Sequence, residues 1–142
     1  MNHLSNEVSI YKDVKETNNP YFIKIEDALK RIKDGRVKQL VDQIRADVAK
    51  GNKEAANKNK AKLPCVLYSG RFDTPVEIIN STTGEITTSK RTDESITEHS
   101  GIVVLDYDNI APHEIKPKLS QDPYIFACWT SPSGNGVKAL VK

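Results

Sequence analysis

The spacing of apolar residues changes from a helical period to a strand period near residue 63, and this change constrains the fold more than any other feature. Between residues 21 and 62, apolar side chains recur every three or four positions, as on one face of an amphipathic helix. From residue 63 to 142 they form short runs separated by turn-forming residues, which is typical of strands. Helices first and strands later predict an α+β fold, with N-terminal helices packed on a mainly antiparallel sheet.

The helical part contains three expected helices. Two are amphipathic, one over Ile25–Ile32 and one over Val37–Val48, and Gly51 ends the second. The third, "NKEAANKNKAK", is polar and basic, which is typical of a solvated helix face; a face that contacts phosphates is the alternative. Residues 1–20 are polar and predict an arm or an edge strand, so residues 21–142 are expected to form one domain, helical over 21–62 and sheet-forming over 63–142.

Length, charge and cysteine content narrow the class of protein. A chain of 142 residues can bury one core, and a net charge of +2 neither requires nor excludes a nucleic-acid partner. The sequence has no apolar run of membrane-spanning length, and residues 1–19 lack the apolar stretch of a signal peptide. Cys65 and Cys128 lie in apolar strand-like runs, as buried thiols of a reducing compartment do. We therefore expect a cytoplasmic protein that does not enter a membrane.

The segment "GIVVLDYD" carries the most chemistry in the chain. Its apolar run ends in acids, which predicts a central strand buried on both faces. Because side chains alternate along a strand, Asp106 and Asp108 are expected on one face, with Cα atoms roughly 6.6 Å apart. Two carboxylates without a nearby His or Cys favour a shared Mg²⁺ or Mn²⁺. The alternative is that both aspartates only cap the loop that follows.

A second motif, "SPSGNGVK", lies between two strand-like runs that we expect to pair antiparallel beside the acidic strand. Turn formation explains the residues Gly134–Gly136, which can take positive φ. It does not explain the two serines around Pro132 or the lysine that follows. Backbone and hydroxyl donors with a lysine suit a phosphate, although this is not a P-loop, because the lysine leads into a strand. The expected nucleotide-binding residues are Ser131, Ser133, Gly134, Gly136 and Lys138.

Strand alternation also predicts how the last strand is oriented. Val137, Ala139 and Val141 should face the helices, whereas Lys138 should share the opposite face with the two aspartates. An acidic pair beside a phosphate-type turn is the arrangement of a metal–triphosphate site, in which Lys138 balances the acids until a nucleotide arrives.

These two motifs, with "LPCVLYSGRFD" upstream, resemble the VirE-type N-terminal domain, a family allied to the archaeo-eukaryotic primase–polymerases. The resemblance covers about residues 60–142. It implies the first part of an RRM-like primase–polymerase domain, in which Asp106 and Asp108 bind the catalytic Mg²⁺ or Mn²⁺. In that superfamily the second motif is usually Ser-x-His and contacts the nucleotide phosphates. Lys138 lies near the position expected for that histidine and keeps a positive charge there.

The resemblance also implies partners and a context. A nucleotidyltransferase of this kind uses a nucleoside triphosphate and a DNA or RNA template, in the replication of a mobile element or phage. A third acid on a later strand completes the site in the superfamily. The domain is therefore expected to be truncated at Lys142, with a helicase-type domain possible further along the parent protein.

Two other classes of function remain open. One is a degenerate, non-catalytic module that binds nucleotide or nucleic acid, because a fold does not decide a function. The other is a phosphatase of the haloacid-dehalogenase type, because "VVLDYDNI" resembles the nucleophile motif of that family. Against the phosphatase, Ile110 follows Asn109 where the motif would have a Thr or Val.

Overall fold

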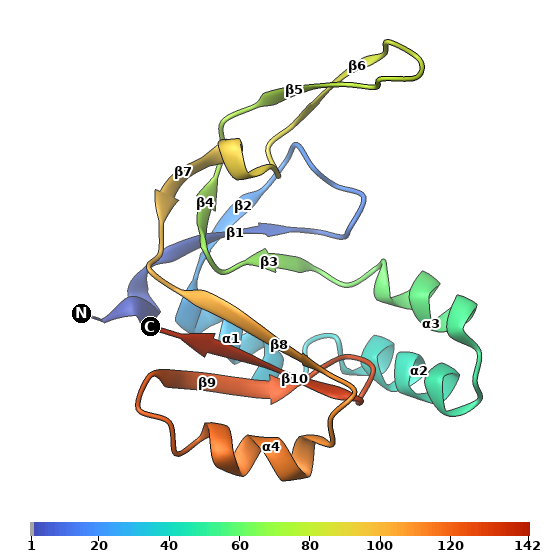
Figure 1. Ribbon diagram of the computed structural model, residues 1–142, viewed down its shortest axis with the longest axis vertical. Coiled ribbons are helices and arrows are strands. Elements are labelled where there is room, and N and C mark those ends of the chain that lie inside the picture. Colours follow the sequence, from blue (N-terminus) through green and yellow to red (C-terminus); the bar gives the residue numbers. More distant parts are fainter. Residues whose placement is uncertain (1) are drawn as a thin grey trace. The chain divides into compact units, whose positions relative to one another are not determined.

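The computed structural model describes residues 2–142 and confirms an α+β fold, with four α-helices and several antiparallel sheets in this range (Figure 1). The chain divides into two compact units, each built from two stretches of sequence. The first unit comprises Met1–Lys30 and Pro64–Gly101, and the second comprises Arg31–Leu63 and Ile102–Lys142. Helix α1 (Ile25–Lys33) crosses from one unit to the other. Both units therefore draw residues from the expected helical half and from the expected sheet half.

The first unit is built around β1 (Glu7–Tyr11), a strand that the sequence placed in a polar arm or at a sheet edge. That prediction was wrong, because β1 is the middle strand of a sheet, between β2 (Tyr21–Lys24) and β3 (Cys65–Leu67), and pairs antiparallel with both. Its last four residues are buried, including Ser9, whose hydroxyl accepts a 2.7 Å hydrogen bond from the backbone N–H of Phe72. The strand was missed because it is short and polar residues lie on both sides of it in the sequence.

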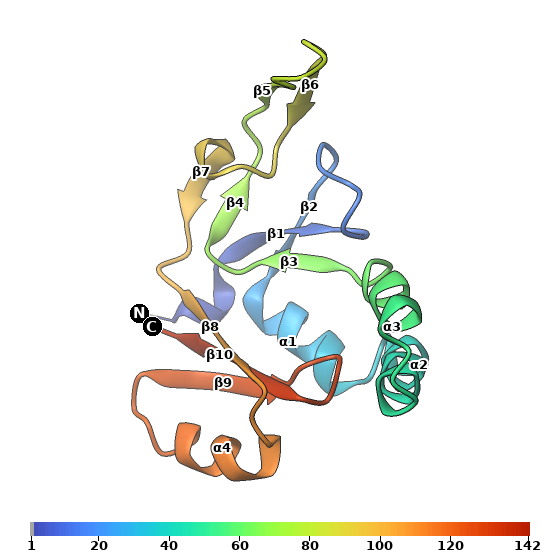
Figure 2. The same cartoon turned by 45° about the vertical axis from the view of Figure 1, so that its right-hand side comes forward.

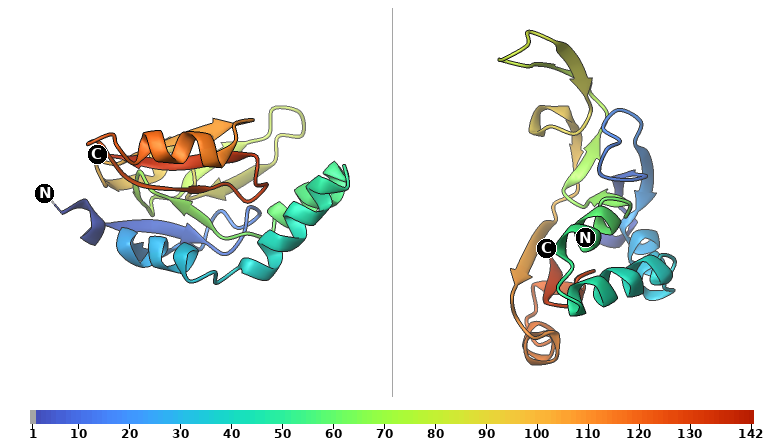
Figure 3. Two further views of the ribbon diagram at one scale, coloured as in Figure 1. Left: turned by 90° about the horizontal axis from the view of Figure 1, so that it is seen from below. Right: turned by 90° about the vertical axis from the view of Figure 1, so that its right-hand side faces the viewer.

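Two further strand pairs complete the first unit. Strand β4 (Gly70–Phe72) pairs antiparallel with β7 (Ile96–His99), and β5 (Val76–Ile79) pairs with β6 (Ile86–Ser89). The β5–β6 pair is a hairpin with a Thr-Gly turn, of the kind that the turn residues of this part of the sequence favour, and Gly84 supplies the positive φ of 71° in it. The hairpin is the yellow-green ribbon in both views of Figure 3. Two 3₁₀ turns, His3–Ser5 and Asp93–Ser95, also belong to this unit.

The second unit contains two of the three helices expected before residue 63. Helices α2 (Lys38–Ala49) and α3 (Lys53–Lys60) lie side by side (Figure 2) and end near the predicted positions. Asp47 joins them: this buried carboxylate accepts hydrogen bonds from the side-chain amides of Gln43 (3.0 Å) and Asn59 (2.9 Å).

The sheet of the second unit has the strand order β8–β10–β9, formed by Val103–Asp108, Gly136–Val141 and Ile125–Thr130 respectively. All pairings are antiparallel, and β9 and β10 pair around the turn as predicted. However, the acidic strand β8 lies at an edge and not in the centre. Val103 is 60% exposed and Val104 40% exposed, so the expectation of a strand buried on both faces was wrong.

Helix α4 (Pro112–Leu119) covers one face of this sheet (Figure 3, left, in orange). Leu119 forms a core with Val137 and Ala139, and Ile115 packs against the same cluster. The prediction that Val137 and Ala139 face a helix is confirmed, but the helix is α4 and not one of the N-terminal helices. The sequence predicted a loop between β8 and β9. Over residues 2–142, no helix is long and apolar enough to cross a membrane.

Candidate functional site

Strand β8 presents the two aspartates on one face. Leu105 and Tyr107 pack against the core cluster under α4, whereas the intervening Asp106 and Asp108 are exposed. The prediction that the two carboxylates share a face is therefore confirmed. The strand ends at Asp108, and Asn109 turns the chain with a left-handed φ of 55°.

Lys138 on β10 lies directly opposite Asp106 on β8, and their side chains form an ion pair. The expected position of the lysine on the aspartate face is thus confirmed. Side-chain exposure is 32% for Lys138 and 49% for Asp106, so water still reaches both groups. A metal ion at Asp106 must therefore compete with the ammonium group, unless a phosphate draws the lysine away. Among residues 2–142, Asp108 makes no side-chain hydrogen bond or ion pair.

The two carboxylates are the oxygen ligands that Mg²⁺ or Mn²⁺ prefers. Within the described residues, no group of three His, Cys, Asp or Glu side chains could hold a metal ion. A magnesium ion commonly binds one or two carboxylates and takes its remaining ligands from water and substrate phosphates. The pair formed by Asp106 and Asp108 therefore fits an ion that arrives with a nucleotide better than a resident metal.

The turn between β9 and β10 is closed by a hydrogen bond from the N–H of Gly134 to the carbonyl of Ser131, 3.0 Å long. Pro132 occupies the second position of this β-turn, which its fixed φ favours, and Gly134 takes a φ of 81°. Residues 131–135 are not helical, as expected. The expectation of positive φ at Asn135 and Gly136 was wrong, since of the three residues only Gly134 has it.

Most of the polar groups in the turn bond to one another. The Ser131 and Ser133 hydroxyls lie 3.1 Å apart, and the Ser131 N–H donates to the carbonyl of Gly136 at 2.8 Å. The N–H of Asn135 points at the Ser133 hydroxyl, 3.5 Å away. Together with the Gly134 N–H, these amides are engaged inside the turn. A phosphate at this turn would therefore have to be bound mainly by side chains and not by the predicted concavity of free backbone donors.

Arg45 of helix α2 is part of the same site, and the sequence analysis missed it. Its guanidinium Nη2 donates a 3.3 Å hydrogen bond to the carbonyl oxygen of Ser131. Nothing in the local sequence could identify this contact, because the two residues are 86 positions apart.

Trp129 on β9 is the Cα partner of Lys138 on the other side of β10. It is half-buried and is the single tryptophan of the chain. Its fluorescence therefore reports on the sheet that carries Asp106 and Lys138.

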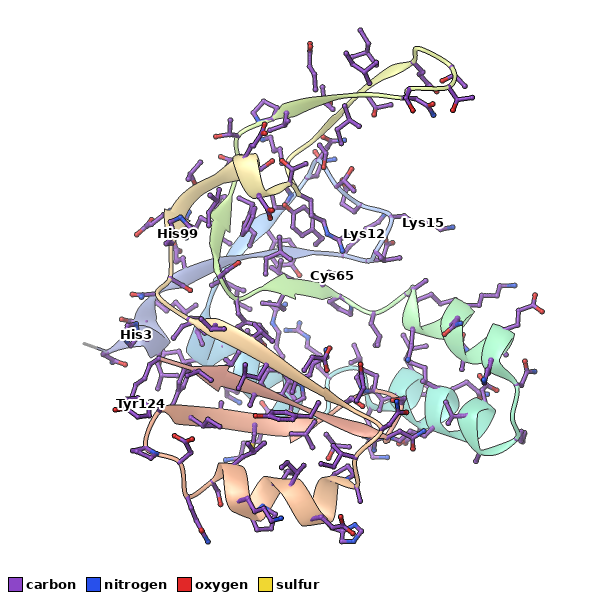
Figure 4. All side chains as sticks on the ribbon, in the orientation of Figure 1. His3, Lys12, Lys15, Cys65, His99 and Tyr124 are labelled. Atoms are coloured by element: carbon purple, nitrogen blue, oxygen red, sulfur yellow. The ribbon has the colours of Figure 1, made fainter. Side chains whose placement is uncertain are left out.

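Several basic side chains of the first unit contact neighbouring residues of that unit; Cys65, which one of them approaches, is labelled in Figure 4. Arg91 donates to the carbonyl of Val14 (2.9 Å), lies 3.7 Å from the Cys65 sulfur and stands over the ring of Tyr11. Lys90 pairs with Asp73 at 2.8 Å. Desolvation by burial raises the pKa of Tyr11. These basic residues thus support the fold of the first unit.

The chain is similar to a known family of protein domains. A family model described as the BT4734-like N-terminal domain matches residues 58–142, more than half of the chain. The matched region contains both aspartates, the turn and Lys138, whereas Arg45 lies before it. No curated protein sequence and no solved structure matches the chain.

Proposed function

We propose that the chain, which belongs to the BT4734-like N-terminal domain family, binds a nucleoside triphosphate together with Mg²⁺ or Mn²⁺. In this proposal it is the N-terminal part of a primase–polymerase-like nucleotidyltransferase that copies a DNA or RNA template, in the replication of a mobile element or phage. The observation that supports it most is the shared face of Asp106, Asp108 and Lys138, next to a Ser-Gly turn.

Each group has a distinct part in this proposal. Asp106 and Asp108 hold the divalent ion, which neutralises charge on the triphosphate when it is bound. Lys138 pairs with Asp106 in the absence of ligand and turns to the phosphates when the ion takes its place. The Ser131 and Ser133 hydroxyls contact the phosphates, and Gly134 and Gly136 let the turn take the shape that presents these hydroxyls.

A non-catalytic nucleotide-binding or nucleic-acid-binding module is the second candidate. It is favoured by the ion pair between Asp106 and Lys138, which occupies one of the two proposed metal ligands. The two functions differ in whether nucleotide binding depends on the divalent ion and on both acids.

Titration of the protein with a nucleoside triphosphate, with and without Mn²⁺, tests the proposal through the fluorescence of Trp129. We expect Mn²⁺-dependent binding that Asp108→Asn abolishes and that Lys138→Ala weakens by about tenfold, the size of one lost charge-assisted contact. Glu114→Gln, which removes an exposed acid on α4, is the matched control and should bind like the wild type.

Each other outcome has a defined meaning. If no triphosphate binds, the proposal is wrong. Binding that is indifferent to Mn²⁺ and to both acids supports the non-catalytic module, and release of phosphate from a simple phosphate ester supports a phosphatase. Incorporation of labelled nucleotide by the wild type, compared with the Asp106→Ala variant, then separates catalysis from binding.

A further inference from the structure

Arg45 lies along the turn between β9 and β10, next to Gly134. A Cβ built on Gly134 would be 3.6 Å from Nε of Arg45 and 3.7 Å from its Cδ and Cγ. The guanidinium group reaches on to the carbonyl of Ser131. The methylene groups of Arg45 therefore lie along the turn, and its guanidinium group is hydrogen-bonded to Ser131, the first residue of the turn.

The charge of Arg45 is not balanced by a carboxylate within residues 2–142. The two acids of its own helix are both engaged elsewhere: Asp42 pairs with Lys38, and Asp47 accepts from two side-chain amides. The hydrogen bond to Ser131 uses one of the five guanidinium donors. The other donors can bind an acceptor that comes from outside the chain.

Apart from the Ser131 and Ser133 hydroxyls, the site offers few uncommitted donors for the several oxygens of a triphosphate. The turn amides bond within the turn, and the Lys138 ammonium is bound to Asp106. A guanidinium group presents two parallel N–H donors that match two phosphate oxygens.

We infer that Arg45 is a second phosphate-binding cation of this site and binds the triphosphate of the same nucleotide beside Lys138. The inference rests on the proposed function and adds to it a residue outside the strands and the turn. It predicts selectivity for ligands with several phosphates, because each added phosphate brings oxygens and charge that a second cation can bind.

Affinities of the full chain for a nucleoside triphosphate and for the corresponding monophosphate, both with Mn²⁺, test the inference. Arg45→Gln keeps a polar side chain with N–H donors but removes the charge. We expect it to weaken triphosphate binding by about tenfold and monophosphate binding much less. Arg45→Lys keeps the charge but not the two parallel N–H donors of the guanidinium group. Its affinity for the triphosphate should lie between those of the wild type and Arg45→Gln. Arg36→Gln, the same change at an exposed arginine before α2, should bind both ligands like the wild type.

The outcomes separate this inference from the proposed function. If Lys138→Ala weakens triphosphate binding while Arg45→Gln binds like the wild type, the inference is wrong and the proposed function stands. Equal losses for both ligands in Arg45→Gln would show that Arg45 only positions the turn, which also overturns the inference. If the wild type binds no triphosphate, the proposed function fails, and the inference fails with it. Far-UV circular dichroism and the urea midpoint show whether each variant is folded, and Arg45→Lys gives the same comparison if Arg45→Gln is unstable.

Discussion

Gly136 lies so close to Tyr107 that a Cβ built on the glycine would be 2.3 Å from the tyrosine's carbonyl oxygen. That oxygen belongs to the backbone of β8 and cannot rotate away as a side-chain atom could. Strands β8 and β10 can therefore approach each other at this end of the ladder only because residue 136 has no side chain. The same approach places Asp108 opposite Gly136 and brings the acidic strand next to the turn.

Gly136→Ala should destabilise the second unit, because the added methyl group must push β10 away from β8. We expect a loss of about 1–3 kcal/mol in the free energy of unfolding, the usual cost of overpacking a tight contact. Urea unfolding followed by Trp129 fluorescence measures it. Asn135→Ala, at the exposed neighbouring position, should leave the urea midpoint within experimental error of the wild type. If Gly136→Ala and Asn135→Ala had the same urea midpoint, β8 and β10 could move apart to accept the methyl group without a loss of stability, and the prediction would be wrong.

The ion pair between Lys138 and Asp106 should contribute little to stability. Both side chains remain partly exposed, and such pairs are worth less than about 1 kcal/mol. A double-mutant cycle with Lys138→Met and Asp106→Asn, read by urea unfolding, measures the coupling energy. We expect it to stay below that value and to fall further in 1 M salt. A coupling of several kcal/mol would show that the pair stabilises the sheet, and a phosphate could then not displace the lysine readily.

Asp47→Ala should loosen the helical pair α2–α3. The substitution removes a buried carboxylate that accepts hydrogen bonds from the side-chain amides of Gln43 and Asn59, and hydrogen bonds to a charged group contribute more than neutral ones. We expect a loss of about 1–3 kcal/mol, measured from thermal unfolding by far-UV circular dichroism. Asp42→Ala, on the same helix, removes an exposed carboxylate paired with Lys38 and should cost less than about 0.5 kcal/mol. Similar losses for the two variants would contradict the role assigned to Asp47.

Tyr68 should make the protein sensitive to alkali. Burial raises the pKa of its phenol from 10.0 to about 12. Below pH 10 the phenol keeps its proton in both states and has no effect. Between pH 10 and 12 the unfolded chain releases the proton more readily than the folded chain does, so stability falls as pH rises. The total loss from this group is about 2–3 kcal/mol.

Unfolding free energies of the wild type and of Tyr68→Phe between pH 9 and 12 measure this effect as a difference. The variant should lose less stability over that range than the wild type. Tyr124→Phe removes a tyrosine that is 65% exposed and should follow the wild-type curve. If the Tyr68→Phe curve runs parallel to the wild-type curve, the phenol is not shielded as described.

Sequence alone located the features that depend on local spacing. The helices α2 and α3, the β5–β6 hairpin and the pairing of β9 with β10 follow from periodicity and turn residues, which act over a few positions. Alternation along two strands placed Asp106 and Lys138 on one face before their pairing was known. The ion pair required only that the two strands be neighbours.

Features that depend on distant residues were missed or misplaced. The apolar run before Asp106 indicated a buried strand, but the order of strands in a sheet is set by contacts along the whole chain, and β8 lies at the edge. Helix α4 was hidden by two prolines, although Pro112 in the first turn is a signal for a helix start and could have been used. Arg45 had no signal, because its contact with the turn joins residues far apart in sequence.

The strand order β8–β10–β9 also bears on how the protein is made. During translation β8 and β9 leave the ribosome before β10, yet within this sheet each of them pairs only with β10. A nascent chain that ends before Gly136 therefore carries two strands without their partner, and α4 lacks Val137 and Ala139 to pack on. The arrival of β10 therefore supplies the partner strand of both β8 and β9 and the residues on which α4 packs. Lys138 arrives with it, so no translation intermediate can form the ion pair between Asp106 and Lys138 before the sheet itself is complete.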